Sequence, residues 1–95
     1  MSDLSSQETV ERYSVDIQEM HRAIVSLTEE LVAIDSYNQR AEACKNKALR
    51  TIFEHNRDEE KEHASMLLEW IRRNDDAFSG ELKNHLFTKH SIKHR

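Results

Sequence analysis

Almost nothing in this sequence interrupts a helix. Proline is absent, and Gly80 is the single glycine in a chain of 95 residues. Proline and glycine are the residues that disfavour helix interiors most strongly, so the backbone can stay helical over long stretches. Charged residues make up 34% of the chain and hydrophobic residues 37%, a mixture typical of long solvated helices. The sequence therefore predicts an all-α protein.

Apolar residues recur at the helical spacing of three and four along two stretches. A first helix is expected over about residues 6–43, opened by a capping box at Ser5–Glu8. A second is expected over about 47–73, and a short third over about 76–88. Residues 89–95 form a basic tail.

The two long helices, joined by a turn at about 44–47, are expected to form an antiparallel hairpin. A chain of this size buries little core, and one hairpin cannot cover both sides of its apolar stripes. Two hairpins can, so pairing with a second copy into a four-helix bundle is expected. The stripes, in which Trp70 is a predicted core residue, are Ile17, Met20, Ile24, Leu27, Leu31 and Ile34, then Leu49, Ile52, Phe53, Leu67, Trp70 and Ile71.

Charge, hydropathy and cysteine usage exclude several classes of partner and site. The formal net charge is −4 and no helix carries a basic stripe, so nucleic acid is not expected as a partner. The longest apolar run is far too short to span a membrane, and the N-terminus shows no secretory signal. Cys44 is the only cysteine, which leaves no disulfide framework and no thiolate zinc site. A reducing cytoplasm fits this pattern.

Polar residues interrupt the second stripe between Phe53 and Leu67. At about 100° per residue, Asn56, Glu60 and His63 fall inside the stripe, whereas His55 and Glu62 point away from it. Burying an unpaired carboxylate is unfavourable, so Glu60 must be ion-paired, metal-bound or close to water. Because Glu60 and His63 are three residues apart, both side chains can reach one point.

Glu30 supplies a third candidate ligand from the first helix. It lies on the flank of that stripe, whereas Glu29 points nearly opposite. Di-iron carboxylate bundles take one Glu from each of two helices and Glu-x-x-His from each of two others. One chain therefore carries half of that ligand set, and two-fold pairing would supply the other half.

A second interpretation stands beside the metal centre. Glu-x-x-His is common on solvated helices, and Glu60 and His63 could instead hydrogen-bond across an interface or hold a structural metal. The chain would then be a non-catalytic helical assembly module. Tyr37 is expected to be a packing residue, with a hydrogen bond that supports the centre as the alternative.

Four stretches of the sequence resemble the encapsulated ferritin family, ferritin-like cargo proteins of encapsulin nanocompartments. They are HRAIVSLTEELVAIDSYNQR (21–40), HNRDEEKEHA (55–64), LEWIRRND (68–75) and LFT (86–88), and they cover most of the two long helices. The resemblance implies that residues 1–95 form one ferritin-like half-domain. Two such chains would pair around a ferroxidase centre, and the dimers would assemble into a ring, typically a decamer.

The resemblance also implies the ligands and the reaction. The family ligands fall on Glu30, Glu60 and His63, and the family tyrosine falls on Tyr37. The implied activity is oxidation of Fe(II) to Fe(III) by O₂, with two irons per dimer, for storage inside an encapsulin shell in the cytoplasm. Mn or Zn could occupy the same ligands, and a manganese oxidase or a peroxide-scavenging site would share them.

The sequence departs from the family pattern at three places. Glu29 matches the first member of an acidic pair that leads iron to the centre, but Val32 replaces the second. Ser36 stands where a tryptophan commonly precedes the tyrosine. Family members usually end in a flexible extension with a shell-docking peptide, whereas this chain ends at Ser91–Arg95. The resemblance thus specifies neither the access route for iron nor the attachment to a shell.

Overall fold

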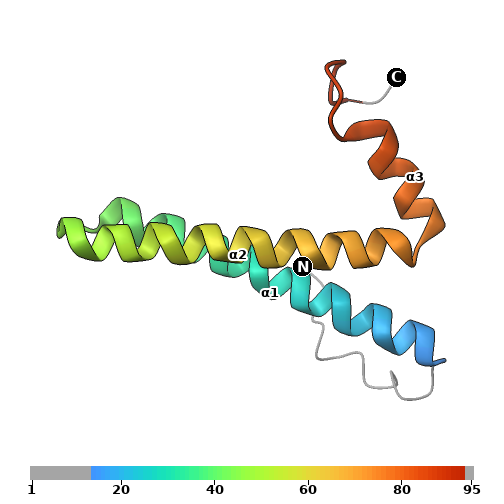
Figure 1. Ribbon diagram of the computed structural model, residues 1–95, viewed down its shortest axis with the longest axis horizontal. Coiled ribbons are helices and arrows are strands. Elements are labelled where there is room, and N and C mark those ends of the chain that lie inside the picture. The colour runs from blue at the N-terminus through green and yellow to red at the C-terminus, as the bar shows by residue number, and fades with distance from the viewer. Residues whose placement is uncertain (1–13, 94–95) are drawn as a thin grey trace.

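The structure, a computed structural model, describes residues 14–93 as three helices and no strand. They are α1 (Val15–Ala43), α2 (Lys47–Arg73) and α3 (Asp76–His85). Helices α1 and α2 run antiparallel as a long hairpin, and α3 leaves the far end of α2 at a steep angle (Figure 1). The predicted all-α class is confirmed, and α2 spans the predicted range.

The first helix begins later than the sequence predicted. Ser14 has an extended backbone, with φ −60° and ψ 161°, and its hydroxyl accepts a hydrogen bond from the backbone N–H of Ile17. This is the geometry of a helix N-cap, so α1 starts at Val15. The predicted capping box at Ser5–Glu8 lies outside the described residues.

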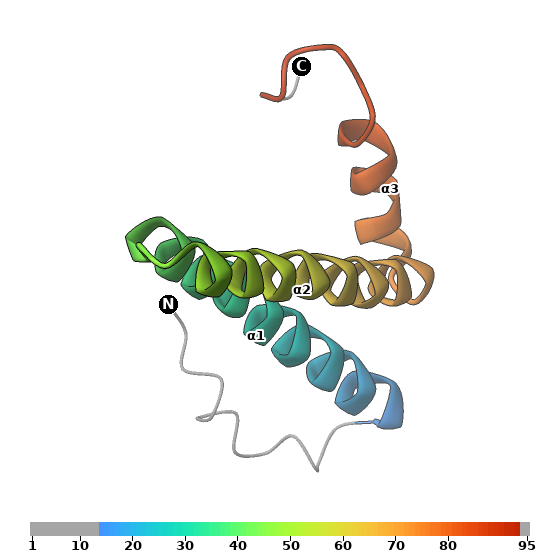
Figure 2. The same cartoon turned by 60° about the vertical axis from the view of Figure 1, so that its left-hand side comes forward.

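A short non-helical turn joins α1 to α2, as expected. The Asn46 side chain caps α2 by accepting from the backbone N–H of Leu49 at 2.9 Å. The guanidinium of Arg50 donates to the Cys44 carbonyl oxygen, at 2.6 Å from Nη2 and 3.2 Å from Nε. The two helices lie apart towards the N-terminal end of α1, as both views show (Figures 1 and 2).

The third helix is shorter than predicted. Asp75 caps it by accepting from the backbone N–H of Phe78 at 2.9 Å. The helix ends at His85 rather than at 88, because Leu86 is extended and Phe87 adopts a left-handed φ of 58°. A right-handed helix cannot continue through those two conformations.

The single chain buries very little apolar surface. Among the described residues, the buried hydrophobic side chains are Ala23, Ala41, Ala64 and Ile71. Trp70, a predicted core residue, is instead 40% exposed, and Leu31 and Ile52 of the stripes are more than half exposed. One hairpin is too thin to cover these residues, which is the condition that predicts pairing with a second copy. None of the described helices is long and apolar enough to cross a membrane.

Candidate metal centre

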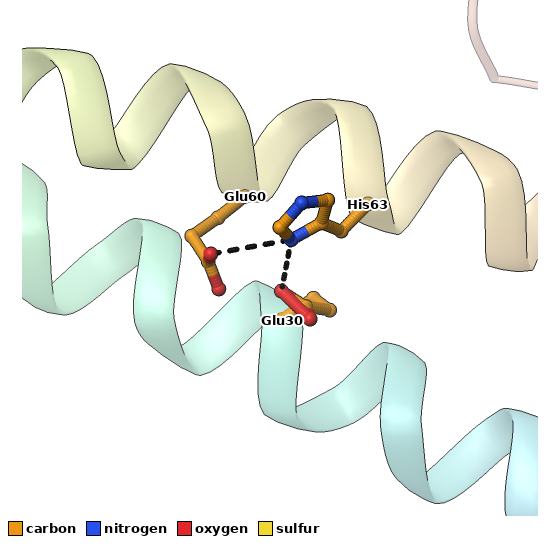
Figure 3. Close-up of side chains that lie close together, drawn as sticks. All are labelled: Glu30, Glu60 and His63. Atoms are coloured by element: carbon orange, nitrogen blue, oxygen red, sulfur yellow. Dashed lines mark ion pairs between the residues drawn. The ribbon is translucent and has the colours of Figure 1, made fainter.

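Three side chains from two helices converge in the middle of the hairpin. Glu30 comes from α1, and Glu60 and His63 come from α2, so the sequence prediction that they lie together is confirmed. Each residue offers one ligand atom, and these atoms lie within 4.8 Å of one another. Figure 3 shows the His63 imidazole with both carboxylates turned towards it.

The closest contacts of the centre all involve one ring nitrogen. His63 Nδ1 lies 3.3 Å from Glu60 Oε1, on the same helix, and 3.6 Å from Glu30 Oε2, on the other helix. The two carboxylate side chains are each 23% exposed, whereas the His63 side chain is 42% exposed. The centre is therefore half-buried between the helices and open on the imidazole side.

The charges of the centre are not balanced. Glu30 Oε2 is buried without a hydrogen-bond partner, since 3.6 Å is too long for a hydrogen bond to Nδ1. The pKa of Glu30 is raised, first by hydrogen bonding with Glu60 and then by burial, and His63 lowers it in part. Two carboxylates sharing one half-buried site repel, so a cation or a proton must offset their charge.

The donor set fits a divalent transition metal. Two carboxylate oxygens and one imidazole nitrogen are ligands that suit Fe(II) and Mn(II), and Zn(II) can compete for them. The orphaned Glu30 oxygen is the kind of buried polar atom that needs a partner. One chain brings three ligand atoms together, which leaves coordination positions for ligands from elsewhere.

The residues expected around the centre are also placed by the structure. Glu29 is exposed, as its position on the helix predicted. The centroid of the Tyr37 ring lies 6.1 Å from that of the Phe53 ring. The Arg40 guanidinium carbon lies over the Tyr37 ring, 5.1 Å from its centroid. These are the contacts of a packing residue, and the supporting role of Tyr37 stays a prediction.

One cross-helix contact near the centre was not predicted. Arg57 on α2 donates to Asn38 on α1. Both residues directly follow positions that the sequence did single out, Asn56 and Tyr37. A long charged residue next to a stripe position can lie along the groove between helices, and this is the signal that could have identified Arg57.

Comparisons with known proteins identify the family of this chain. The EncFtn-like family model matches residues 5–89. The chain belongs to this family. It is 48% identical over 91 residues to the encapsulated ferritin-like protein of Rhodospirillum rubrum, and 51% identical over 71 residues to a ferritin-like protein of Thermotoga maritima. The predicted resemblance to encapsulated ferritins is thereby confirmed.

The extent of these matches differs between relatives. The match covers 96% of this chain and 65% of the R. rubrum protein, and 75% and 62% for the T. maritima protein, so the chain spans just under two thirds of their length. The crystal structure of protein ne0167 from Nitrosomonas europaea is similar with a TM-score of 0.85 and 62% identity. That match covers 88% of this chain and 92% of the other.

Proposed function

We propose that this protein is a ferroxidase whose di-iron site forms between two chains. The observation that carries the proposal is the buried Glu30 oxygen, which has no hydrogen-bond partner beside a second carboxylate and an imidazole. A chain with one copy of Glu30, Glu60 and His63 holds half of the four-Glu, two-His set of di-iron carboxylate bundles. A two-fold partner supplies the other half.

The ligands have separable roles in this proposal. Glu30, Glu60 and His63 of each chain would hold the two irons, with Glu60 and its mate shared between the two metals. The carboxylates favour the more highly charged Fe(III), which promotes loss of an electron from each Fe(II). O₂ would take one electron from each of the two Fe(II) ions and, with two protons from solvent, be released as hydrogen peroxide. The ferric product then leaves the centre for storage.

Storage requires a compartment outside the chain. The name of the R. rubrum relative describes an encapsulated protein. We infer by similarity that this chain assembles into a ring, typically a decamer, and works in the cytoplasm inside an encapsulin shell. Each chain then acts as a ferritin-like half-domain.

One observation favours the alternative of a non-catalytic assembly module. His63 Nδ1 is 3.3 Å from one carboxylate and 3.6 Å from the other, and a protonated imidazole could offset part of their charge without a metal. Such a centre would hold two copies together but would not consume O₂. Iron oxidation therefore separates the two functions.

The test is to add Fe(II) anaerobically to the assembled protein, admit air and follow ferric absorbance. Glu60→Ala and His63→Ala remove ligands. His55→Ala and Glu59→Ala are matched controls, because these two residues form an exposed pair at 3.0 Å on the same helix. We expect fast oxidation in the wild type and both controls, and the buffer rate in both ligand variants. Wild-type oxidation no faster than buffer would leave the assembly module as the better interpretation.

A further inference from the structure

Arg57 connects the two long helices beside the metal centre. Its Nη1 donates to Asn38 Oδ1 on α1 at 3.3 Å, and its Nε donates to Asp58 Oδ1 on α2 at 2.9 Å. The Arg57 side chain is only 23% exposed. A guanidinium is a rigid planar fork, so the bond to Asp58 fixes the donor on α2 while the other arm contacts α1.

The Arg57–Asn38 contact lies to one side of the centre along the hairpin. Arg57 precedes Glu60 by three residues, about one helical turn, and Asn38 follows Glu30 by eight residues, about two turns. The contact therefore lies on the side of the centre that faces the turn between the helices. On the opposite side the helices diverge (Figures 1 and 2).

The three candidate ligands depend differently on how α1 and α2 are aligned. Glu60 and His63 share one helix, so their spacing does not change when the helices slide. Glu30 lies on the other helix, and a slip of one residue moves it by about 1.5 Å along the axis. Metal–ligand bond lengths vary by only about 0.2 Å, so after such a slip Glu30 could reach the metal only by changing its side-chain conformation, and a fixed register avoids that change.

We propose that the Arg57–Asn38 hydrogen bond is a positioning contact that sets the α1–α2 register and thereby holds Glu30 against Glu60 and His63. Arg57 and Asn38 act through Glu30 and do not touch the metal. The proposal rests on the proposed function only in assigning the three side chains to a metal ion. It does not depend on which metal binds or on whether iron is oxidised.

The test is a titration of the intact, assembled protein with Co(II), whose visible absorption reports the coordination geometry, alongside urea unfolding without metal. Asn38→Leu removes the acceptor, Arg57→Lys removes the fork but keeps the charge, and Asn38→Asp restores an acceptor. Gln39→Leu and Arg22→Lys are matched controls, because Gln39 and Arg22 bond Asp35 and Glu19 on their own helix.

We expect Asn38→Leu and Arg57→Lys each to weaken Co(II) binding about tenfold, the low end for residues that orient metal ligands. Their Co(II) spectra should match that of Glu30→Gln, the ligand that register controls. The double variant should bind no more weakly than either single variant, because one contact is lost only once. Asn38→Asp and both controls should bind as the wild type does.

Wild-type Co(II) affinity and spectrum in Asn38→Leu would overturn the proposal. So would equal weakening in Gln39→Leu, or a loss of affinity that only follows the loss of urea resistance. If Asn38→Leu does not fold, the same comparison of Co(II) affinity and spectrum is made with Arg57→Lys. If the wild-type protein binds Co(II) but does not oxidise Fe(II), the proposed ferroxidase function is wrong. The effect of Asn38 and Arg57 on Co(II) binding can still be measured in that case.

Discussion

Two clusters of side chains on this hairpin, one around Glu69 and one around Glu30, differ in how the negative charge of the glutamate is offset. At the end of α2, Glu69 accepts from Arg72 at 2.7 Å through both carboxylate oxygens and from Arg73 at 2.6 Å. These bonds, Arg72 first and then Arg73, lower the pKa of Glu69 to about 2. At the centre, the neighbour of Glu30 is another carboxylate, and the pKa of Glu30 is raised instead.

The difference shows what the centre lacks. The Glu69 cluster holds its own cations, so its charge is offset within one helix. Glu30 and Glu60 face one imidazole, and one buried oxygen has no hydrogen-bond partner. An incompletely satisfied carboxylate pair is unfavourable in a chain that buries so little else, and a bound divalent cation would offset that charge. Substitutions in one cluster at a time test whether the charge of each glutamate is offset in the way described.

The largest expected effect comes from adding or removing metal. A cation that binds only the folded, assembled protein should stabilise it by about 2.7 kcal/mol at a free concentration 100 times its dissociation constant. Assembly should strengthen at the same time, because metal removes carboxylate repulsion. Size exclusion with light scattering and urea unfolding, with Mn(II) or with EDTA, measure both. Metal-independent assembly at every protein concentration would contradict the proposed inter-chain site.

His63→Arg should convert the centre into a cluster like that of Glu69. A guanidinium near Glu30 and Glu60 would offset their charge permanently, so the metal-free protein should gain up to about 1 kcal/mol, the scale of a partly exposed ion pair, since the side chain at position 63 is 42% exposed. Metal binding should be lost. Urea unfolding in EDTA and a Co(II) titration test both changes. A variant that is less stable in EDTA and still binds Co(II) would show that the charge imbalance is not the controlling feature.

Glu30→Gln should have a smaller effect of opposite sign in the two conditions. Gln keeps the shape of Glu but removes the like charge beside Glu60, so the metal-free protein should unfold at an equal or slightly higher urea concentration. With metal present, the variant should be less stable than the wild type because a ligand is lost. Glu42→Gln, at an exposed position of the same helix, is the control and should change neither value.

Glu69→Gln should have the smallest effect, and that effect should disappear at acidic pH. A carboxyl with a lowered pKa contributes stability above its ordinary pKa, and that contribution is lost as pH falls through the folded value. The relevant window therefore runs from about 4.5 down to about 2. The variant should lose stability relative to wild type above this window and converge with it below. Thermal unfolding followed by circular dichroism at several pH values measures this, and exposure of the pair keeps the effect small.

The sequence predicted the centre better than it predicted the helix ends. Glu60 and His63 could be placed because both lie on one helix, where spacing alone determines which side chains converge. Glu30 followed from its position on the flank of the other stripe. The Asn38–Arg57 contact could not be found this way, because it depends on the register between helices, which periodicity within a single helix does not encode.

The errors have physical reasons of the same kind. Ser14 caps α1 through its hydroxyl, so the helix begins at Val15, just before the first apolar residue of the stripe at Ile17. Leu86 and Phe87 leave the helical conformation even though apolar spacing continues through Leu86. Trp70 lies on the stripe, but one chain has no second layer to cover it. Local pattern predicts which face is apolar and not what covers that face.

The exposure of Trp70 makes assembly visible without a label. It is the only tryptophan in the sequence, so tryptophan fluorescence of the whole chain comes from one ring. That ring is 40% exposed on the hairpin of a single chain. Its emission should therefore move to shorter wavelength if a partner covers this part of α2, and stay in place if it does not. The fold thus carries an intrinsic optical probe at a surface where the second copy is expected.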